Sequence, residues 1–247
     1  MVMEHLVGTK KLGIIGGMGP EATVSMFSLV VKMTSADNDQ DHLEIFVHNN
    51  NRIPDRTKAI LGEGASPVKE LFRSARYLEH SGADVIIIPC ITSHFFLQDL
   101  QRRLEIPIIN AVEETVENIH KGNVVFQKVG ILATTGTIAT GLFQRALDKH
   151  NILAIIPSQK VQINQVMKGI YGNDGIKAGK NYGIAKARIL SAAESLIACG
   201  AQAIIAGCTE IPLVLSNKDI SVPLINPMEI LARRAIQYCH ATVRTEY

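Results

Sequence analysis

The chain has 247 residues, 47% of them hydrophobic, which is enough to bury a sizeable core in one large domain or two smaller ones. Its formal charge is +2, and no dense stripe of Lys and Arg with interleaved aromatic residues indicates a nucleic-acid partner. No apolar run approaches the roughly 18 residues of a membrane helix, and residues 1–11 lack the hydrophobic centre of a signal peptide. The composition therefore predicts a cytoplasmic protein without a membrane partner.

Four cysteines in a chain of this length do not indicate a disulfide scaffold, and no C-x-x-C or H-x-x-x-H pair indicates a metal site. We therefore expect no metal. Cys199 and Cys239 lie in helical patterns, where small buried or surface thiols are common. Cys90 and Cys208 instead follow apolar runs of strand length.

The first strand is expected at residues 11–16, and a glycine-rich loop follows it. The glycines permit a tight turn, so this loop can approach an anion closely. The spacing G-x-G-x-x-A over 17–22 also fits a dinucleotide-binding pattern, which requires an acidic residue near the end of the second strand. That strand, expected at 43–47, runs into His48 and three asparagines, so no nicotinamide cofactor is expected.

A polar, turn-prone segment follows the second strand. It reads NNNRIPDRT and is expected to carry Asn51, Asp55, Arg56 and Thr57 to the mouth of a site at the carboxyl ends of the strands. Arginine suits this role because its guanidinium can hold a carboxylate through two hydrogen bonds. The alternative is a solvated surface loop with a local Asp–Arg pair.

The remaining pattern alternates helices with strands, as in α/β proteins. His94, four residues after Cys90, is either a partner for that thiol or a solvent-facing residue at the start of a helix. The threonine-rich segment 133–137 can donate hydrogen bonds to an anion or cap the next helix, and either Lys177 or Lys180 can reach the site. Strands are expected at 106–110, 129–132, 153–156 and 222–226, and helices at 24–33, 67–80, 93–103, 112–120, 161–171 and 227–240.

Cys208 follows the apolar run 203–206 and precedes a Thr-Glu pair that opens a new helical pattern. In an open α/β sheet, ligands bind at this carboxyl edge. The amides and positive end of a following helix favour thiolate over thiol. The pKa of Cys208 is therefore expected to lie below the free value of about 8.5.

The segment around Cys208 repeats the segment around Cys90 at an offset of 118 residues. G-I-I at 13–15 and G-I-L at 130–132 repeat at an offset of 117, and the segments I-P-I-I-N and V-P-L-I-N repeat at 116. Three strand-like segments in the same order at nearly one offset indicate a duplicated α/β unit with one cysteine in each copy.

Two thiols on opposing sides of a ligand suit racemisation at an α-carbon. One base removes the α-proton from one face while an acid on the other face returns a proton, and two copies related by approximate two-fold symmetry supply that geometry. Each thiol must serve as base and as acid, which a pKa near the working pH permits. Donors aimed at the α-carboxylate help to stabilise the enolate-like intermediate.

The motifs GIIGGMGPEAT, IPDRT, PCITSH and GCTEIPL, in this order, resemble the pyridoxal-phosphate-independent aspartate/glutamate racemase family over essentially the whole chain. The resemblance implies an α/β fold of two similar lobes, each a parallel sheet flanked by helices, related by pseudo-two-fold symmetry with the site between them. It implies no cofactor, commonly a homodimer, and lobes that exchange their last segments. Residues 1–105 plus 222–247 then form the lobe that carries Cys90, and residues 106–221 form the lobe that carries Cys208.

Carried over residue by residue, the resemblance makes Cys90 and Cys208 the acid/base pair. Lys177 is preferred to Lys180 because it stands in the family's K-A-G pattern. The substrate contacts or supports that the resemblance implies are Met18, Gly19, Asn51, Arg56, Ile91, Thr92, Ser93, Thr134, Lys177, Thr209 and Glu210.

Family members commonly have Asn-Thr after the first cysteine, whereas this chain has Ile91-Thr92. The departure bears on the substrate more than on the reaction. Arg56 and Lys177 suit a second carboxylate, so we expect L- and D-aspartate first and glutamate next, and Ile91 leaves open a broader amino-acid substrate. The alternatives are a hydantoin racemase, a maleate isomerase that uses one cysteine as a nucleophile, and a non-catalytic two-lobed binder of a small anionic ligand.

Overall fold

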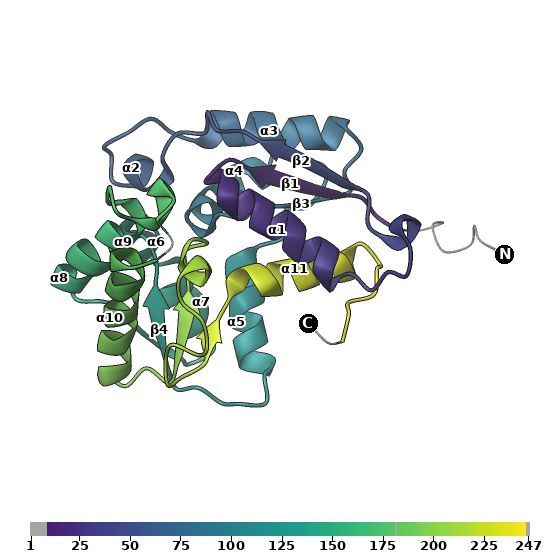
Figure 1. Ribbon diagram of the computed structural model, residues 1–247. Coiled ribbons are helices and arrows are strands. Elements are labelled where there is room, and N and C mark those ends of the chain that lie inside the picture. Colours follow the sequence, from purple (N-terminus) through teal and green to yellow (C-terminus); the bar gives the residue numbers. More distant parts are fainter. Residues whose placement is uncertain (1–8, 181, 246–247) are drawn as a thin grey trace. The chain divides into compact units, whose positions relative to one another are not determined.

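The computed structural model describes residues 9–180 and 182–245 of the chain (Figure 1). This described part divides into two compact units. The first unit contains the residues up to Asp55, Gly64–Glu114 and the residues from Met228 onward, and the second contains Arg56–Glu63 and Thr115–Pro227. Within the described ranges, no helix combines the length and the apolar character needed to cross a bilayer. The signal-peptide expectation for residues 1–11 falls largely outside them.

The first unit is built on a three-stranded parallel sheet in the order β2-β1-β3. The central strand β1 (Leu12–Gly16) is fully buried and pairs on one side with β2 (Ile45–Asn49) and on the other with β3 (Val85–Ile87). In Figure 1, α3 (Val68–His80) lies along one face of this sheet and α1 (Pro20–Met33) along the other. Cover on both faces explains why β1 is a continuous apolar run rather than an alternating one.

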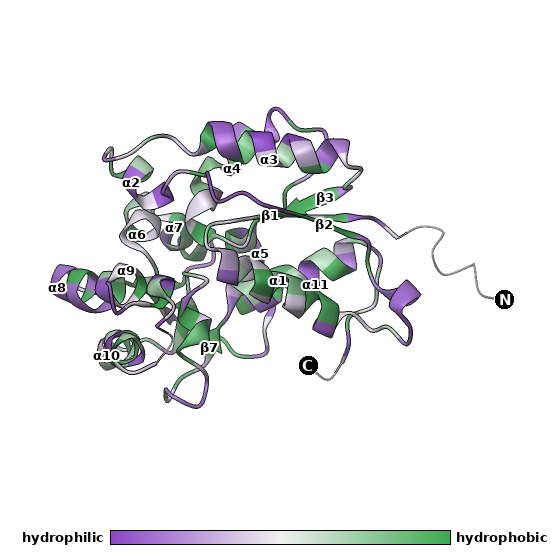
Figure 2. Cartoon of the chain, turned by 45° about the horizontal axis from the view of Figure 1, so that its top comes forward, coloured by the Kyte–Doolittle hydropathy of each residue, from purple (hydrophilic) through white to green (hydrophobic). Residues whose placement is uncertain are grey.

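Helix α3 shows how the sequence produces this layer. Leu71, Ala75 and Leu78 recur at helical spacing and are fully buried, and Figure 2 shows purple, hydrophilic stretches between the green ones along the same helix. Burying each leucine side chain contributes about 1.5–3 kcal/mol to stability. The other helices of this unit are the 3₁₀ helices η1 (Asp39–Asp41) and η2 (Ile91–Phe96), then α4 (Leu97–Gln101), α5 (Ala111–Lys121, which continues into the second unit) and α11 (Pro227–Tyr238).

The second unit is built on a four-stranded parallel sheet in the order β5-β4-β6-β7. Its strands are β4 (Lys128–Leu132), β5 (Leu153–Ile155), β6 (Ala203–Ala206) and β7 (Leu224–Ile225). Helix α10 (Ile184–Ala198) packs on β4 and β6 and buries Ile189, Ala192 and Leu196 in a core that includes Ile204. The remaining elements are α2 (Arg56–Ile60), α6 (Thr135–Thr140), α7 (Leu142–Asp148), α8 (Gln159–Val161), the π-helix η3 (Gln162–Met167), α9 (Lys168–Tyr171), and the 3₁₀ helices η4 (Ile176–Ala178) and η5 (Ile211–Leu213).

The two sheets repeat individual contacts as well as strand order. β1 pairs with β3 through Gly13 and Ile86, and β4 pairs with β6 through Gly130 and Ile204. A Cβ at Gly13 would meet side chains of Leu78, Ala83 and Ile86, and a Cβ at Gly130 would meet their counterparts 118 residues later, Leu196, Ala201 and Ile204. The expected fold class, two similar α/β units with parallel sheets, is confirmed.

Two details differ from the expected pattern. Residues 106–110 do not form a strand, and only the isolated bridge between Ile86 and Ile108 links them to β3. That bridge is the counterpart of the β6–β7 pairing at Ile204. The single helix expected over 93–103 is also wrong, since the chain forms the 3₁₀ helix η2 and then the short helix α4.

The repeated glycine contacts give a stability prediction. A Cβ at Gly130 would lie 2.5 Å from Cδ1 of Ile204 and 3.1 Å from Cβ of Ala201, so we expect Gly130→Ala to cost about 1–3 kcal/mol through overpacking. Gly122→Ala is the control, because its Cβ would come no closer than 3.3 Å to another atom on an exposed surface, and its cost should stay within about 0.5 kcal/mol. Urea unfolding of the two variants checks this, and a Gly130→Ala protein as stable as the wild type would contradict it.

Candidate active site

In the first unit, three loops follow parallel strands and therefore lie at one edge of the sheet. They carry Met18 after β1, Asn50 after β2 and Cys90 after β3. Met18 and Cys90 are buried, whereas Gly19 is partly exposed. The sequence thus places a glycine loop and a cysteine loop at the same edge, as expected.

The glycine loop is held by its own atoms. Gly17 has φ +97°, and a Cβ there would lie 2.3 Å from the carbonyl oxygen of Asn50, so no other residue fits. The Gly17 amide donates to Oγ1 of Thr23 (3.0 Å), which in turn donates to the carbonyl oxygen of Gly19 (3.1 Å). The Gly17 N–H is therefore committed to Thr23 in α1, and these hydrogen bonds fix the shape of the loop.

Asn50 organises the neighbouring loop. Its Nδ2 donates to Oε2 of Glu70 (3.1 Å) and to Oγ of Ser74 (3.0 Å), and its Oδ1 accepts from the amide of Arg52 (3.0 Å). Asn51, the asparagine implied by the family resemblance, is exposed in the turn, and its contact with substrate stays a prediction. Sequence reasoning missed Asn50 because three adjacent asparagines give no signal of which one faces α3.

Cys90 precedes the 3₁₀ helix η2 and is 6% exposed. Its carbonyl oxygen accepts hydrogen bonds from Oγ of Ser93 (2.6 Å) and from Nδ1 of His94 (3.0 Å), while Ile91 and Thr92 beside it are also buried. The solvent-facing alternative for His94 is wrong, since the residue is buried. Burial lowers the pKa of His94 to about 4, so the ring is neutral near pH 7 and holds the cysteine loop through the backbone.

Cys208 takes part in a hydrogen-bonded group in the second unit. Its Sγ donates to Oε2 of Glu210 (2.9 Å), which also accepts from Oγ1 of Thr209 (3.0 Å). The other carboxylate oxygen, Oε1, is ion-paired with Nζ of Lys177. Cys208, Thr209 and Glu210 are buried, and the Lys177 side chain is 22% exposed. A thiol, a carboxylate and an ammonium are thus connected through one carboxyl group.

The expectation that Cys208 has a lowered pKa and forms a thiolate is wrong, because its surroundings favour the protonated thiol. Burial and the negative charge of Glu210 raise the pKa of Cys208 well above its ordinary value, although the charge of Lys177 acts in the opposite direction. Burial disfavours the charged form of Glu210 as well, but Lys177 and the hydrogen bonds bring its pKa below the ordinary value. The expected helix after Cys208 is only the three-residue η5, which is too short to offset these effects.

The threonine loop, residues 133–137, lies beside the Cys208 loop because β4 pairs in parallel with β6. Thr134 caps α6, its Oγ1 accepting from the amide of Thr137 (3.3 Å), so the capping role is confirmed. Two residues that sequence reasoning missed also hold this loop. Nε2 of Gln162 donates to the carbonyl oxygen of Ala133 (2.9 Å), and the amide of Thr135 lies 3.3 Å from Sδ of Met167.

Arg56 begins the segment Arg56–Glu63, which belongs to the same unit as Cys208, although the residues that flank this segment on both sides lie in the first unit. It begins α2, which packs on α6, where a Cβ at Gly136 would lie 2.8 Å from Oγ1 of Thr57. Arg56 and Thr57 are buried, so the alternative of a solvated surface loop is wrong for these two residues. The second unit therefore combines an arginine, a threonine loop and a protonated cysteine.

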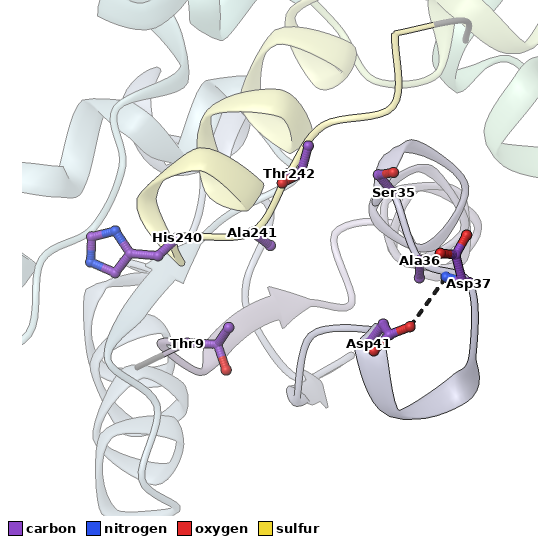
Figure 3. A pocket seen from close by; sticks show the side chains of 8 residues that line it. All are labelled: Thr9, Ser35, Ala36, Asp37, Asp41, His240, Ala241 and Thr242. Carbon is purple, nitrogen blue, oxygen red and sulfur yellow. Dashed lines mark hydrogen bonds between the residues drawn. The ribbon is translucent and has the colours of Figure 1, made fainter. Parts of the chain in front are cut away.

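A cavity of about 210 Å³ lies elsewhere, in the first unit, and contains none of the expected site residues (Figure 3). Oδ2 of Asp41 there accepts from the amide of Asp37 (3.3 Å), so that carboxylate is engaged by the chain itself. The cavity is lined by Thr9, Ser35, Ala36, Asp37, Asp41, His240, Ala241 and Thr242.

Within residues 9–180 and 182–245, no three His, Cys, Asp or Glu side chains are grouped so as to hold a metal ion.

Residues 15–235 match the sequence profile of the family described as Asp/Glu/Hydantoin racemase. The match covers most of the chain, including Cys90, Cys208 and the strands that precede them. The chain belongs to this family, and its class is therefore that of an isomerase that racemises amino acids or related compounds.

The chain is similar to individual racemases in sequence and in structure. The broad specificity amino-acid racemase RacX of Bacillus subtilis (strain 168) is 27% identical over 233 residues, which is 91% of this chain and 96% of RacX. The structure of Picrophilus torridus aspartate racemase is 29% identical, with a TM-score of 0.83 over 96% of this chain and 97% of that one. Glutamate racemase from Francisella tularensis, solved in complex with D-glutamate, is 20% identical and shows the fold alone, with a TM-score of 0.68 over 94% of this chain and 81% of that one.

The raised pKa of Cys208 predicts how fast its thiol is alkylated. Because Glu210 raises that pKa, Glu210→Gln should lower it and increase the thiolate fraction at pH 8 by about tenfold for each unit of pKa lost. Labelling by iodoacetamide should therefore become faster, by a smaller factor because a thiolate of lower pKa is less nucleophilic. Lys177→Met should slow labelling, because Lys177 lowers the pKa. Peptide-level mass spectrometry measures the rates, with the exposed Cys199 as reference in the same chain. Slower labelling of Cys208 in Glu210→Gln would contradict the assignment.

Proposed function

We propose that the chain is a cofactor-independent racemase that interconverts L- and D-aspartate, with glutamate as the next substrate, by two-base proton transfer at the α-carbon. One observation carries the proposal. A buried thiol, Cys208, is hydrogen-bonded to a carboxylate at the carboxyl edge of one parallel sheet, and the repeated unit has a second cysteine, Cys90, after the equivalent strand. No metal or redox step is required, since only protons move.

In the proposed reaction, the thiolate of Cys90 takes the α-proton, and the electron pair of the broken C–H bond passes into the carboxylate as an enolate-like intermediate. Cys208 then donates its own proton to the opposite face of the α-carbon. One C–H bond breaks and one forms, Cys90 ends as a thiol, and Cys208 ends as a thiolate. The acid role falls to Cys208 in this direction because burial and Glu210 favour its protonated form.

Glu210 and Lys177 suit the reverse direction as well. A thiol with a raised pKa gives a stronger base once it is ionised, and Lys177 offsets the repulsion between that thiolate and Glu210. The substrate carboxylates are assigned to Arg56 and to donors of the threonine loop around Thr134. The other proposed contacts or supports are Met18, Gly19, Asn51, Ile91, Thr92, Ser93 and Thr209.

A broader amino-acid substrate is the second candidate. Lys177, expected to hold a second carboxylate, is already paired with Glu210, which reduces the net positive charge available to the substrate side chain. Ile91 places an apolar side chain directly after Cys90. Similarity to a broad-specificity amino-acid racemase also favours a broader substrate. Racemisation of neutral amino acids at rates comparable to aspartate would select this candidate.

The remaining expectations belong to the same proposal. The reaction needs no pyridoxal phosphate, and the protein is a homodimer in the cytoplasm. One lobe consists of residues 1–105 plus 222–247, and the other consists of residues 106–221. Omitting pyridoxal phosphate from every assay and measuring mass in solution address the first two.

The proposal predicts exchange of the α-hydrogen with solvent. Incubation of each aspartate enantiomer in heavy water, without added cofactor, should incorporate deuterium at the α-position as optical rotation decays. Cys90→Ser and Cys208→Ser should each reduce interconversion by at least about 10²-fold, the usual contribution of a general acid or base. NMR and polarimetry measure both signals.

Cys199→Ser is the matched control, because that thiol is exposed and outside the proposed site, and it should retain full activity. Unchanged activity in either catalytic variant, or turnover only with pyridoxal phosphate, would refute two-base chemistry. A covalent adduct on one cysteine would favour a maleate isomerase, and selective turnover of hydantoins would favour a hydantoin racemase. Ligand binding without turnover, unaffected by either serine, would indicate a binding protein.

A further inference from the structure

Gln162 is the first residue of the π-helix η3 and is 6% exposed. Its side chain crosses to the threonine loop, where Nε2 donates to the carbonyl oxygen of Ala133 (2.9 Å) and to Oγ1 of Thr135 (3.3 Å). Met167, at the other end of the π-helix, accepts from the amide of Thr135. Both ends of this unusual helix therefore hold the same loop. Short π-helical segments are rare and are frequent at functional sites.

The other side-chain atom of Gln162, Oε1, is buried and has no hydrogen-bond partner among the described residues. Its identity as the oxygen follows from its neighbours, because the carbonyl oxygen of Ala133 can only accept and must therefore face the NH₂ group. Buried side-chain acceptors are nearly always satisfied in folded proteins. This acceptor therefore still requires a donor, which no described residue supplies.

The position of Gln162 links it to Cys208 through contacts within the second unit. Ala133, whose carbonyl oxygen it binds, packs against the loop before Cys208, since a Cβ at Gly207 would lie 2.9 Å from Cβ of Ala133. The pairing of Leu132 with Ala206 places both loops at the same end of β4 and β6. Gln162 therefore belongs to the layer that supports the cysteine and threonine loops.

We propose that Gln162 is a specificity-determining residue, whose Oε1 accepts a hydrogen bond from the ammonium group of the amino-acid substrate while its Nε2 positions the threonine loop. The inference rests on the proposed racemase function. The carboxylates of aspartate and glutamate are acceptors only, so the ammonium is the one strong donor that these substrates offer to a carbonyl oxygen. A hydrogen bond to a charged group is also stronger than one between neutral groups.

The test compares two ligands that differ in the amino group. Racemic aspartate and succinate share two carboxylates, but succinate has no ammonium, and racemic ligand keeps its composition during turnover. Gln162→Met also removes both contacts of Nε2 with the threonine loop, so it should weaken both ligands. Calorimetry should show that it weakens aspartate about tenfold to a hundredfold more than succinate, the usual effect of losing a hydrogen bond to a charged group.

Thr135→Val is the matched control, because it removes one partner of Nε2 and keeps Oε1. It should change the affinities of aspartate and succinate by the same factor. Gln162→Glu retains an acceptor oxygen but removes the donor to Ala133, so both ligands should bind more weakly while the preference for aspartate over succinate is kept or increased. This preference serves as the test if Gln162→Met fails to fold.

An equal loss of both ligands in Gln162→Met, or no loss of either, would overturn the inference and leave Gln162 as a support of the loop. A Gln162→Glu variant without preference for aspartate would do the same. These outcomes differ from failure of the proposed function, in which the wild-type protein neither binds aspartate nor exchanges its α-hydrogen.

Discussion

The chemistry of the second unit depends on one carboxyl group shared between a thiol and an ammonium. Oε2 of Glu210 accepts a hydrogen bond from the thiol of Cys208, and Oε1 pairs with Lys177. In a buried setting, neither a free thiolate nor a free carboxylate is favourable, so each member of the group fixes the protonation of the next. Burial, together with a residue two positions beyond the cysteine, thus keeps the thiol protonated at rest.

The repeated architecture explains why two cysteines occupy equivalent places. Gly13 allows β1 to approach β3, and Gly130 allows β4 to approach β6, the strands that precede the two cysteines. The three residues that face Gly130 lie 118 positions after the three that face Gly13. The pattern of apolar runs and glycines was sufficient to predict two α/β units, parallel strands and the cysteine edge. These features follow from strand periodicity and strand order, which are written directly in the sequence.

Other features depend on side-chain direction and could not be predicted. The raised pKa of Cys208 depends on how deeply the thiol is buried and on the Glu210 side chain turning back toward Sγ. An apolar pattern also does not distinguish an α-helix from the 3₁₀ turns found after both cysteines. Gln162 was missed because its partners lie 27 and 29 residues earlier in the chain. Asn50 was missed because its role depends on contacts with α3.

The division of the chain into two units also limits how the protein can be cut. The backbone passes between the units four times, after Asp55, Glu63, Glu114 and Pro227, and one of these crossings lies inside the continuous helix α5. No single cleavage therefore yields two complete halves, despite the internal repeat. A fragment ending near residue 120 would lack both α6, on which α2 packs, and α11, which belongs almost entirely to the first unit, so neither copy is complete within one half of the sequence.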